Sequence, residues 1–93
     1  MLSETQKRNI IEIASPFRPA YLGVFGSYAR NEETPESDLD LLIEFQDTVN
    51  LFDFVGLKQD ISDKLGVEVD LVSKKAINKY VLPYIEKDLI VIL

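Results

Sequence analysis

The chain has 93 residues, of which 46% are hydrophobic and 28% are charged, and its formal net charge is −6 at pH 7. This composition is typical of a soluble globular protein, and the length fits a single domain over residues 1–93. The excess of acidic residues argues against a general basic surface, so we expect no direct binding of nucleic acid. No apolar run approaches the roughly 18 residues that span a bilayer, and residues 1–8 lack a secretory apolar core. We therefore expect a cytoplasmic protein that does not bind membranes.

Two residue types are missing from the sequence. There is no cysteine, which excludes disulfides and thiolate metal sites. There is also no histidine, which removes the commonest general base and the usual zinc ligand. Any bound metal must therefore be held by oxygen atoms, which favours magnesium, manganese or calcium.

The N-terminal part predicts a helix followed by a strand. Ser3 and Gln6 have the spacing of a capping box, and an apolar stripe follows as far as Ala14. Two prolines shortly afterwards end the helix. Residues 21–25 are a short apolar run and predict a buried first strand.

A turn and a polar loop connect this strand to the next. Gly26 breaks the first strand, and Ser27 to Arg30 predicts a short helix with Ser27 near its N-cap. Residues 31–37 are polar and contain a proline, so we expect a loop. Residues 38–45 predict a second strand whose side chains alternate between two faces. One face carries Leu39, Leu41, Ile43 and Phe45, and the other carries Asp38, Asp40, Leu42 and Glu44.

A second helix and a third strand follow. Asn50 with Asp53 indicates the helix start, apolar residues recur at helical spacing, and Gly66 suits the C-terminal cap. Residues 67–72 predict a strand with Val69 on its apolar face.

The C-terminal region is less regular. Ser73 could cap a short helix over residues 74–80, and Pro83 interrupts a second helical piece. Residues 88–93 form an apolar tail, which predicts a last strand or a segment that packs on the core.

Three carboxylates stand out from their surroundings. Alternation places Asp38 and Asp40 on one side of a strand, roughly 6–7 Å apart along the chain. Two such charges repel each other unless a cation lies between them. Asp70 is a third carboxylate on an otherwise apolar strand, and it faces the same point if the two strands are neighbours. Three carboxylates can hold two magnesium ions, which clamp the oxygens of a phosphoryl or nucleotidyl transfer.

The Gly-Ser turn supplies a second set of groups. Gly26 allows the backbone to approach a phosphate closely, and Ser27 offers a hydroxyl. The N–H groups at a helix start favour an anion, and Arg30 adds a positive charge one turn later. Each piece alone also fits a plain structural role as a turn, an exposed strand residue or a surface charge. It is the order and spacing of the pieces that indicate a site.

That order resembles the DNA polymerase β-like nucleotidyltransferase superfamily, and most closely its minimal nucleotidyltransferase branch. The resemblance is carried by Phe-Gly-Ser-Tyr-Ala-Arg at 25–30, Ser-Asp-Leu-Asp-Leu-Leu-Ile-Glu-Phe at 37–45 and Val-Asp-Leu-Val at 69–72. This branch includes the antitoxin partners of HEPN-domain ribonucleases in toxin–antitoxin pairs. Asn31 departs from the pattern, because many relatives have glycine there.

The resemblance implies an α/β (α+β) fold with a small mixed β-sheet flanked by helices. It implies that Asp38 and Asp40 are paired metal ligands and that Asp70 is the third carboxylate, which activates the attacking hydroxyl. Gly26 and Ser27 would hold the triphosphate. The implied cofactor is Mg²⁺, as two ions, with Mn²⁺ as a substitute, and the implied substrate is ATP.

The resemblance also suggests the activity. The leading hypothesis is transfer of AMP from ATP to a tyrosine of a HEPN-type toxin, so that the chain acts as an antitoxin. Larger members of the superfamily carry an added helical domain, so we expect a partner to provide the acceptor surface here. A second hypothesis is that the acidic chain neutralises a basic ribonuclease by binding alone. A third is a calcium-binding or metal-dependent hydrolase module.

Overall fold

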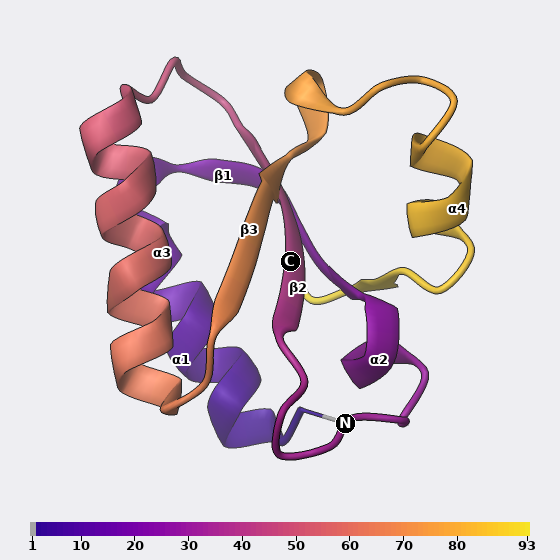
Figure 1. Ribbon diagram of the computed structural model, residues 1–93. Helices are drawn as coiled ribbons and strands as arrows, with labels where there is room; N and C mark the ends of the chain where they lie inside the picture. Colours follow the sequence, from indigo (N-terminus) through magenta and orange to yellow (C-terminus); the bar gives the residue numbers. More distant parts are fainter. Residues whose placement is uncertain (1) are drawn as a thin grey trace.

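The computed structural model describes residues 2–93. Its strands form one four-stranded sheet in the order β3-β2-β1-β4 (Figure 1). Strand β1 is antiparallel to both β2 and β4, whereas β2 and β3 are parallel. The small mixed sheet flanked by helices that the family resemblance implies is therefore confirmed. In chain order the elements are α1 (Glu4–Ala14), η1 (Ser15–Phe17), β1 (Pro19–Phe25), α2 (Gly26–Ala29), β2 (Leu39–Phe45), α3 (Leu51–Leu65), β3 (Val69–Ser73), η2 (Lys74–Ala76), α4 (Leu82–Glu86) and β4 (Ile90–Val91).

The helices lie on opposite sides of the sheet. Helices α1 and α3 pack against one another on one side, and α2 and α4 lie on the other (Figure 1). Helix α3 is the crossover that connects the two parallel strands. Among residues 2–93, no helix is long and apolar enough to cross a membrane.

Local capping signals set the ends of the two long helices. At the start of α1, the backbone N–H of Gln6 donates to Ser3 Oγ at 3.1 Å and that of Ser3 donates to Gln6 Oε1 at 2.9 Å. At the start of α3, Asp53 N–H donates to Asn50 Oδ1 at 2.8 Å. Gly66 ends α3 in the left-handed conformation, with φ of 72°. These bonds satisfy backbone groups that a helix end leaves without partners.

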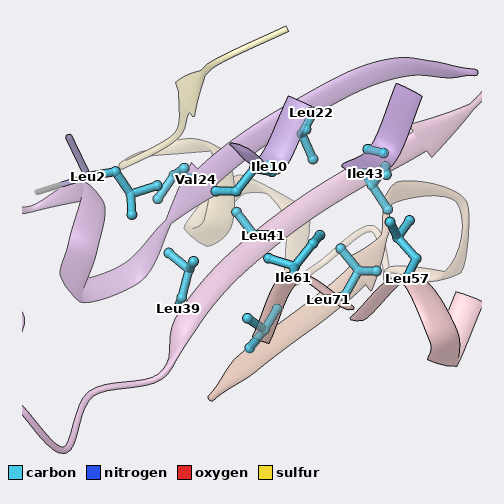
Figure 2. Packing of buried hydrophobic residues seen from close by; sticks show 12 residues of the cluster. Leu2, Ile10, Leu22, Val24, Leu39, Leu41, Ile43, Leu57, Ile61 and Leu71 are labelled. Atoms are coloured by element: carbon cyan, nitrogen blue, oxygen red, sulfur yellow. The ribbon is translucent and has the colours of Figure 1, made fainter. Parts of the chain in front are cut away.

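The main core lies between the sheet and the helix pair α1 and α3 (Figure 2). It is built from aliphatic side chains of all three long strands and both helices. Leu42 is also fully buried, although it points to the sheet face opposite this core. Both faces of the sheet are therefore covered at this point of β2. The buried cluster consists of Leu2, Ile10, Ala14, Leu22, Val24, Leu39, Leu41, Ile43, Leu57, Ile61, Val69 and Leu71.

The region after β3 differs from the sequence prediction. The helix expected over residues 74–80 is only the short 3-10 turn η2, because Ile77 is extended. Asn78 then begins a separate turn, in which its Oδ1 accepts from Tyr80 N–H at 2.8 Å. An Asn side chain that bonds its own backbone competes with helix formation. Pro83 lies in the first turn of α4 and helps to begin this helix instead of interrupting it.

Two smaller expectations are also corrected. The N-cap of α2 is Phe25, without a side-chain capping bond, so Ser27 lies inside the first turn and is not the cap. Strand β3 runs over Val69–Ser73, two residues later at its start than expected. The expected last strand exists as the two-residue β4.

Candidate active site

Strand register brings the predicted carboxylates to one point of the sheet. In the parallel pairing of β2 with β3, Asp40 is the partner of Asp70. In the antiparallel pairing of β1 with β2, Asp40 is also the partner of Phe25, the last residue before the Gly-Ser turn. Asp38 directly precedes β2. The Gly-Ser turn after β1, the two carboxylates at the start of β2 and the one on β3 are therefore neighbours.

Gly26 lies in direct contact with Asp40. Its φ of +70° is in the left-handed region, and a Cβ built on it would overlap Asp40 Oδ2 and lie 3.1 Å from Asp40 Cγ. After Gly26 the chain closes tightly, because Arg30 N–H donates to Gly26 O at 3.1 Å and Glu32 N–H donates to Ser27 O at 2.9 Å. Glycine is required here both by the backbone conformation and by the close carboxylate.

The electrostatics of Asp40 reflect this crowding. Asp40 is half-buried, whereas Asp38 and Asp70 are exposed. Burial raises the pKa of the Asp40 carboxyl, and the negative charges of Asp70 and then Asp38 raise it further. Arg30 acts in the opposite direction and lowers this pKa. The protein alone therefore disfavours the charged form of the Asp40 carboxyl.

The donor set fits a hard cation. Among residues 2–93, no hydrogen bond or ion pair joins the side chains of Asp38, Asp40 and Asp70 to protein groups. The negative charges of Asp70 and Asp38 raise the pKa of Asp40, so a cation bound between these carboxylates would be favoured, and carboxylate oxygens suit Mg²⁺ or Mn²⁺. The described part of the chain has no group of three or more acidic, histidine or cysteine side chains already arranged as a metal site. The assignment of the three aspartates as metal ligands thus stays a prediction.

Arg30 lies beside the site but is held by two other acids. Its Nη1 donates to Asp88 Oδ2 at 2.9 Å and its Nε donates to Glu32 Oε2 at 3.2 Å. The hydrogen bonds to Asp88 and Glu32 raise the pKa of the guanidinium. Asp88 was not anticipated from the sequence, since it lies 58 residues beyond Arg30 and no local pattern connects the two.

Ser27 is half-buried within the first turn of α2. Its hydroxyl makes no hydrogen bond to any group in the described part of the chain. The phosphate role assigned to Gly26 and Ser27 remains a prediction that this placement allows.

The neighbouring surface is hollowed on one side. A polar depression of about 500 Å³ lies beside Asp38 and is lined in part by Ser37, Ser62 and Glu68. A second, more apolar depression of about 380 Å³ lies at the other ends of β2 and β3, where Phe45 and Ser73 line it. Only the first adjoins the carboxylates, so it is the one relevant to the site.

The sequence profile of the family described as "Nucleotidyltransferase domain" matches residues 7–92. The chain belongs to the nucleotidyltransferase domain family. The expectation of a nucleotidyltransferase enzyme is thereby confirmed at the level of the family.

Curated relatives carry a more specific name. A protein of Methanocaldococcus jannaschii, provisionally named protein adenylyltransferase MJ0128, is 51% identical over 70 residues, which cover 74% of this chain and 71% of the relative. Protein adenylyltransferase MntA of Thermococcus cleftensis is 38% identical over 66 residues, or 71% of this chain and 67% of the relative.

Solved structures share the fold. One described as a minimal nucleotidyltransferase has a TM-score of 0.82 and 30% identity, and the match covers 92% of this chain and 88% of that one. A toxin–antitoxin structure with AMP-PNP has a TM-score of 0.84 and 20% identity, and the match covers 94% of this chain and 72% of that one. A structure of a tri-AMPylated Shewanella oneidensis HEPN toxin in complex with an MNT antitoxin gives a TM-score of 0.79 and 18% identity. This match covers 99% of this chain and 72% of that one. The resemblance to the minimal nucleotidyltransferase branch is therefore confirmed.

Proposed function

We propose that this nucleotidyltransferase is a magnesium-dependent protein adenylyltransferase that acts as an antitoxin. It transfers AMP from ATP to a tyrosine hydroxyl of a HEPN-type toxin. The observation that carries the proposal is the position of Asp40, opposite Asp70 and in contact with Gly26. The names of the relatives support protein adenylylation, and the fold neighbours include an antitoxin in complex with an AMPylated HEPN toxin.

The reaction exchanges one phosphorus–oxygen bond for another. The tyrosine oxygen attacks the α-phosphorus of ATP, the bond from that phosphorus to the bridging oxygen of the β-phosphate breaks, and pyrophosphate leaves. The tyrosine proton goes to the carboxylate of Asp70, which is exposed and thus accessible to a partner's side chain. The carboxylates of Asp38, Asp40 and Asp70 would hold Mg²⁺, which would supply positive charge to offset the negative charge that develops during the transfer.

The other residues bind and orient the triphosphate. Gly26 has no side chain, so its backbone can approach a phosphate closely, and the Ser27 hydroxyl can donate to a phosphate oxygen. Arg30 adds positive charge beside these groups. Asp38 and Asp40 would bind the metal ion and would not contact the triphosphate through hydrogen-bond donors, since ionised carboxylates only accept hydrogen bonds.

A second function is favoured by the net charge of −6. An acidic chain can neutralise a basic ribonuclease by forming a complex, without any chemistry, and charge complementarity speeds such an association. This function predicts salt-sensitive binding that survives the loss of all three aspartates.

One experiment separates the two functions. The chain is incubated with Mg²⁺, labelled ATP and the HEPN-type protein encoded beside it, and labelled tyrosine is located by mass spectrometry. Asp38→Ala should abolish labelling and weaken toxin neutralisation. Asp60→Ala, which removes an exposed carboxylate from α3, is the matched control and should change neither. Absence of label together with full neutralisation by Asp38→Ala would reject the enzymatic proposal in favour of binding alone.

A further inference from the structure

The side chain of Arg30 is fixed from two directions. Glu32, two residues away, accepts from Nε, and Asp88 accepts from Nη1 at 2.9 Å. Glu32 belongs to the same polar loop and its side chain is 65% exposed, whereas the side chain of Asp88 is 25% exposed. Asp88 is therefore the less exposed of the two anchors.

Asp88 stands on a segment that is itself attached to the sheet. The next residue, Leu89, packs over Gly23, where a Cβ would come within 2.7 Å of Leu89 Cδ1. Strand β4 then pairs with Gly23 and Val24 of β1. The carboxylate of Asp88 thus has a fixed position relative to β1, the strand that leads into the Gly-Ser turn.

Arg30 keeps donors available next to the site. Its Nη2 makes no hydrogen bond or ion pair to any group within residues 2–93. Its backbone N–H closes the turn onto Gly26 O, and its charge reaches Asp40. A guanidinium held at Nε and Nη1 can still donate from Nη2 to a phosphate oxygen.

We propose that Asp88 is a positioning residue for nucleotide binding, which orders Arg30 before the triphosphate arrives. The inference rests on the proposed function and adds to it a residue outside the family motifs. A free arginine side chain loses considerable rotamer freedom when it binds a ligand, and a side chain that is already ordered avoids this cost. Loss of Asp88 should therefore weaken nucleotide binding although Asp88 never contacts the nucleotide.

The sign of the effect distinguishes positioning from simple charge. ATP is an anion, so removal of a nearby acid should tighten its binding if only long-range repulsion matters. If Asp88 acts by positioning Arg30, its removal should instead weaken the binding of ATP.

The test measures the dissociation constant of ATP with Mg²⁺ by titration calorimetry, without any acceptor. Asp88→Ala should weaken binding about three- to tenfold, the range expected for one side chain that must be ordered on binding. Asp88→Glu, which keeps the charge and the acceptor, should recover most of this loss. The matched control is Asp47→Ala, which removes an exposed ion pair of equal length, Arg18 to Asp47 at 2.9 Å, and should leave binding unchanged.

A double variant shows whether Asp88 acts through Arg30. In an Arg30→Ala background, Asp88→Ala should have no further effect on the dissociation constant. An equal weakening in both backgrounds would overturn the inference, because Asp88 would then act through the C-terminal segment alone. Unchanged or tighter binding by Asp88→Ala would overturn it as well. A wild-type protein that binds no ATP would reject the proposed function itself, and this inference with it.

Discussion

Asp40 is the direct neighbour of Asp70 across the parallel pair of β2 and β3, and no basic side chain forms an ion pair with either carboxylate within residues 2–93. Two acids in this position cost the fold electrostatic free energy. The protein therefore holds charge at this point that a cation would compensate. This relationship has measurable consequences for stability as well as for activity.

The first prediction concerns Asp40→Asn without metal. In the folded state the pKa of Asp40 is raised above its ordinary value of 3.8. At pH values between 3.8 and this raised pKa, the folded state therefore binds more protons than the unfolded state. Stability is then lost as pH rises through this window. At pH 7 and in the presence of a metal chelator, Asp40→Asn should have a higher unfolding midpoint than wild type. This difference between the two proteins should vanish at a pH well below 3.8.

Added Mg²⁺ should raise the unfolding midpoint of wild type more than that of Asp40→Asn, since the variant lacks one of the carboxylates that attract the cation. Asp60→Asn, on the exposed side of α3, serves as the control for a lost charge. A less stable Asp40→Asn at pH 7 would contradict the electrostatic account.

The second prediction separates backbone strain from function at Gly26. Gly26→Ala must adopt a left-handed conformation and also collides with Asp40, so it should lose more than about 1 kcal/mol of stability and at least tenfold in nucleotidyl transfer. Gly66→Ala has the same strain, with φ of +72°, but meets nothing within 4 Å. Gly66→Ala should lose about 1 kcal/mol of unfolding free energy and keep its nucleotidyl-transfer activity. Urea denaturation and the labelling assay measure the two effects, and equal loss of activity in both variants would argue against a special role of Gly26.

A third prediction tests how the C-terminal segment packs on β1. Gly23→Ala would place a methyl group 2.7 Å from Leu89 Cδ1 and 3.3 Å from Ile90 O, so Leu89 must shift. We expect about 1–3 kcal/mol of destabilisation from overpacking. Gly56→Ala, in α3 with nothing within 4 Å, should instead stabilise by about 0.5–1 kcal/mol through helix propensity. Unchanged thermal stability of Gly23→Ala would mean that the segment is not held by this contact.

The fourth prediction concerns Asn31, where glycine was expected. Asn31 has φ of 59°, a conformation that asparagine tolerates better than most residues. Asn31→Ala and Asn31→Gly both remove the side-chain amide, so their difference isolates the backbone. The Asn31→Ala variant should be less stable than the Asn31→Gly variant by about 1 kcal/mol of unfolding free energy, measured by urea denaturation. Equal stability of the two variants would show that the left-handed turn carries no strain.

Much of the fold follows from signals that act over a few residues. The capping box at Ser3 and the N-cap at Asn50 were predicted because a side chain satisfies a backbone group three residues away. Gly66 was predicted as a cap because few other residues accept a positive φ. Alternation along β2 predicted which side chains face the core, and this is confirmed by the burial of Leu39, Leu41 and Ile43.

Other features depend on contacts that no local pattern encodes. The alternation of β2 placed Leu42 beside the carboxylates, but its complete burial depends on chain that covers the second face of the sheet. The helix expected after β3 is cut short by the turn at Asn78, where side-chain and backbone hydrogen bonds compete. The ion pair of Arg30 with Asp88 forms only after the C-terminal segment has docked on β1.

The parallel connection through α3 also determines when the site can form during folding. Asp40 and Asp70 meet only after a long crossover has closed and the register of β2 with β3 is set, and such non-local pairing is slow compared with local helix formation. Nucleotide binding is therefore expected to return with the last phase of refolding, after helical signal has recovered. In this molecule the active site would serve as a reporter of the completed native topology.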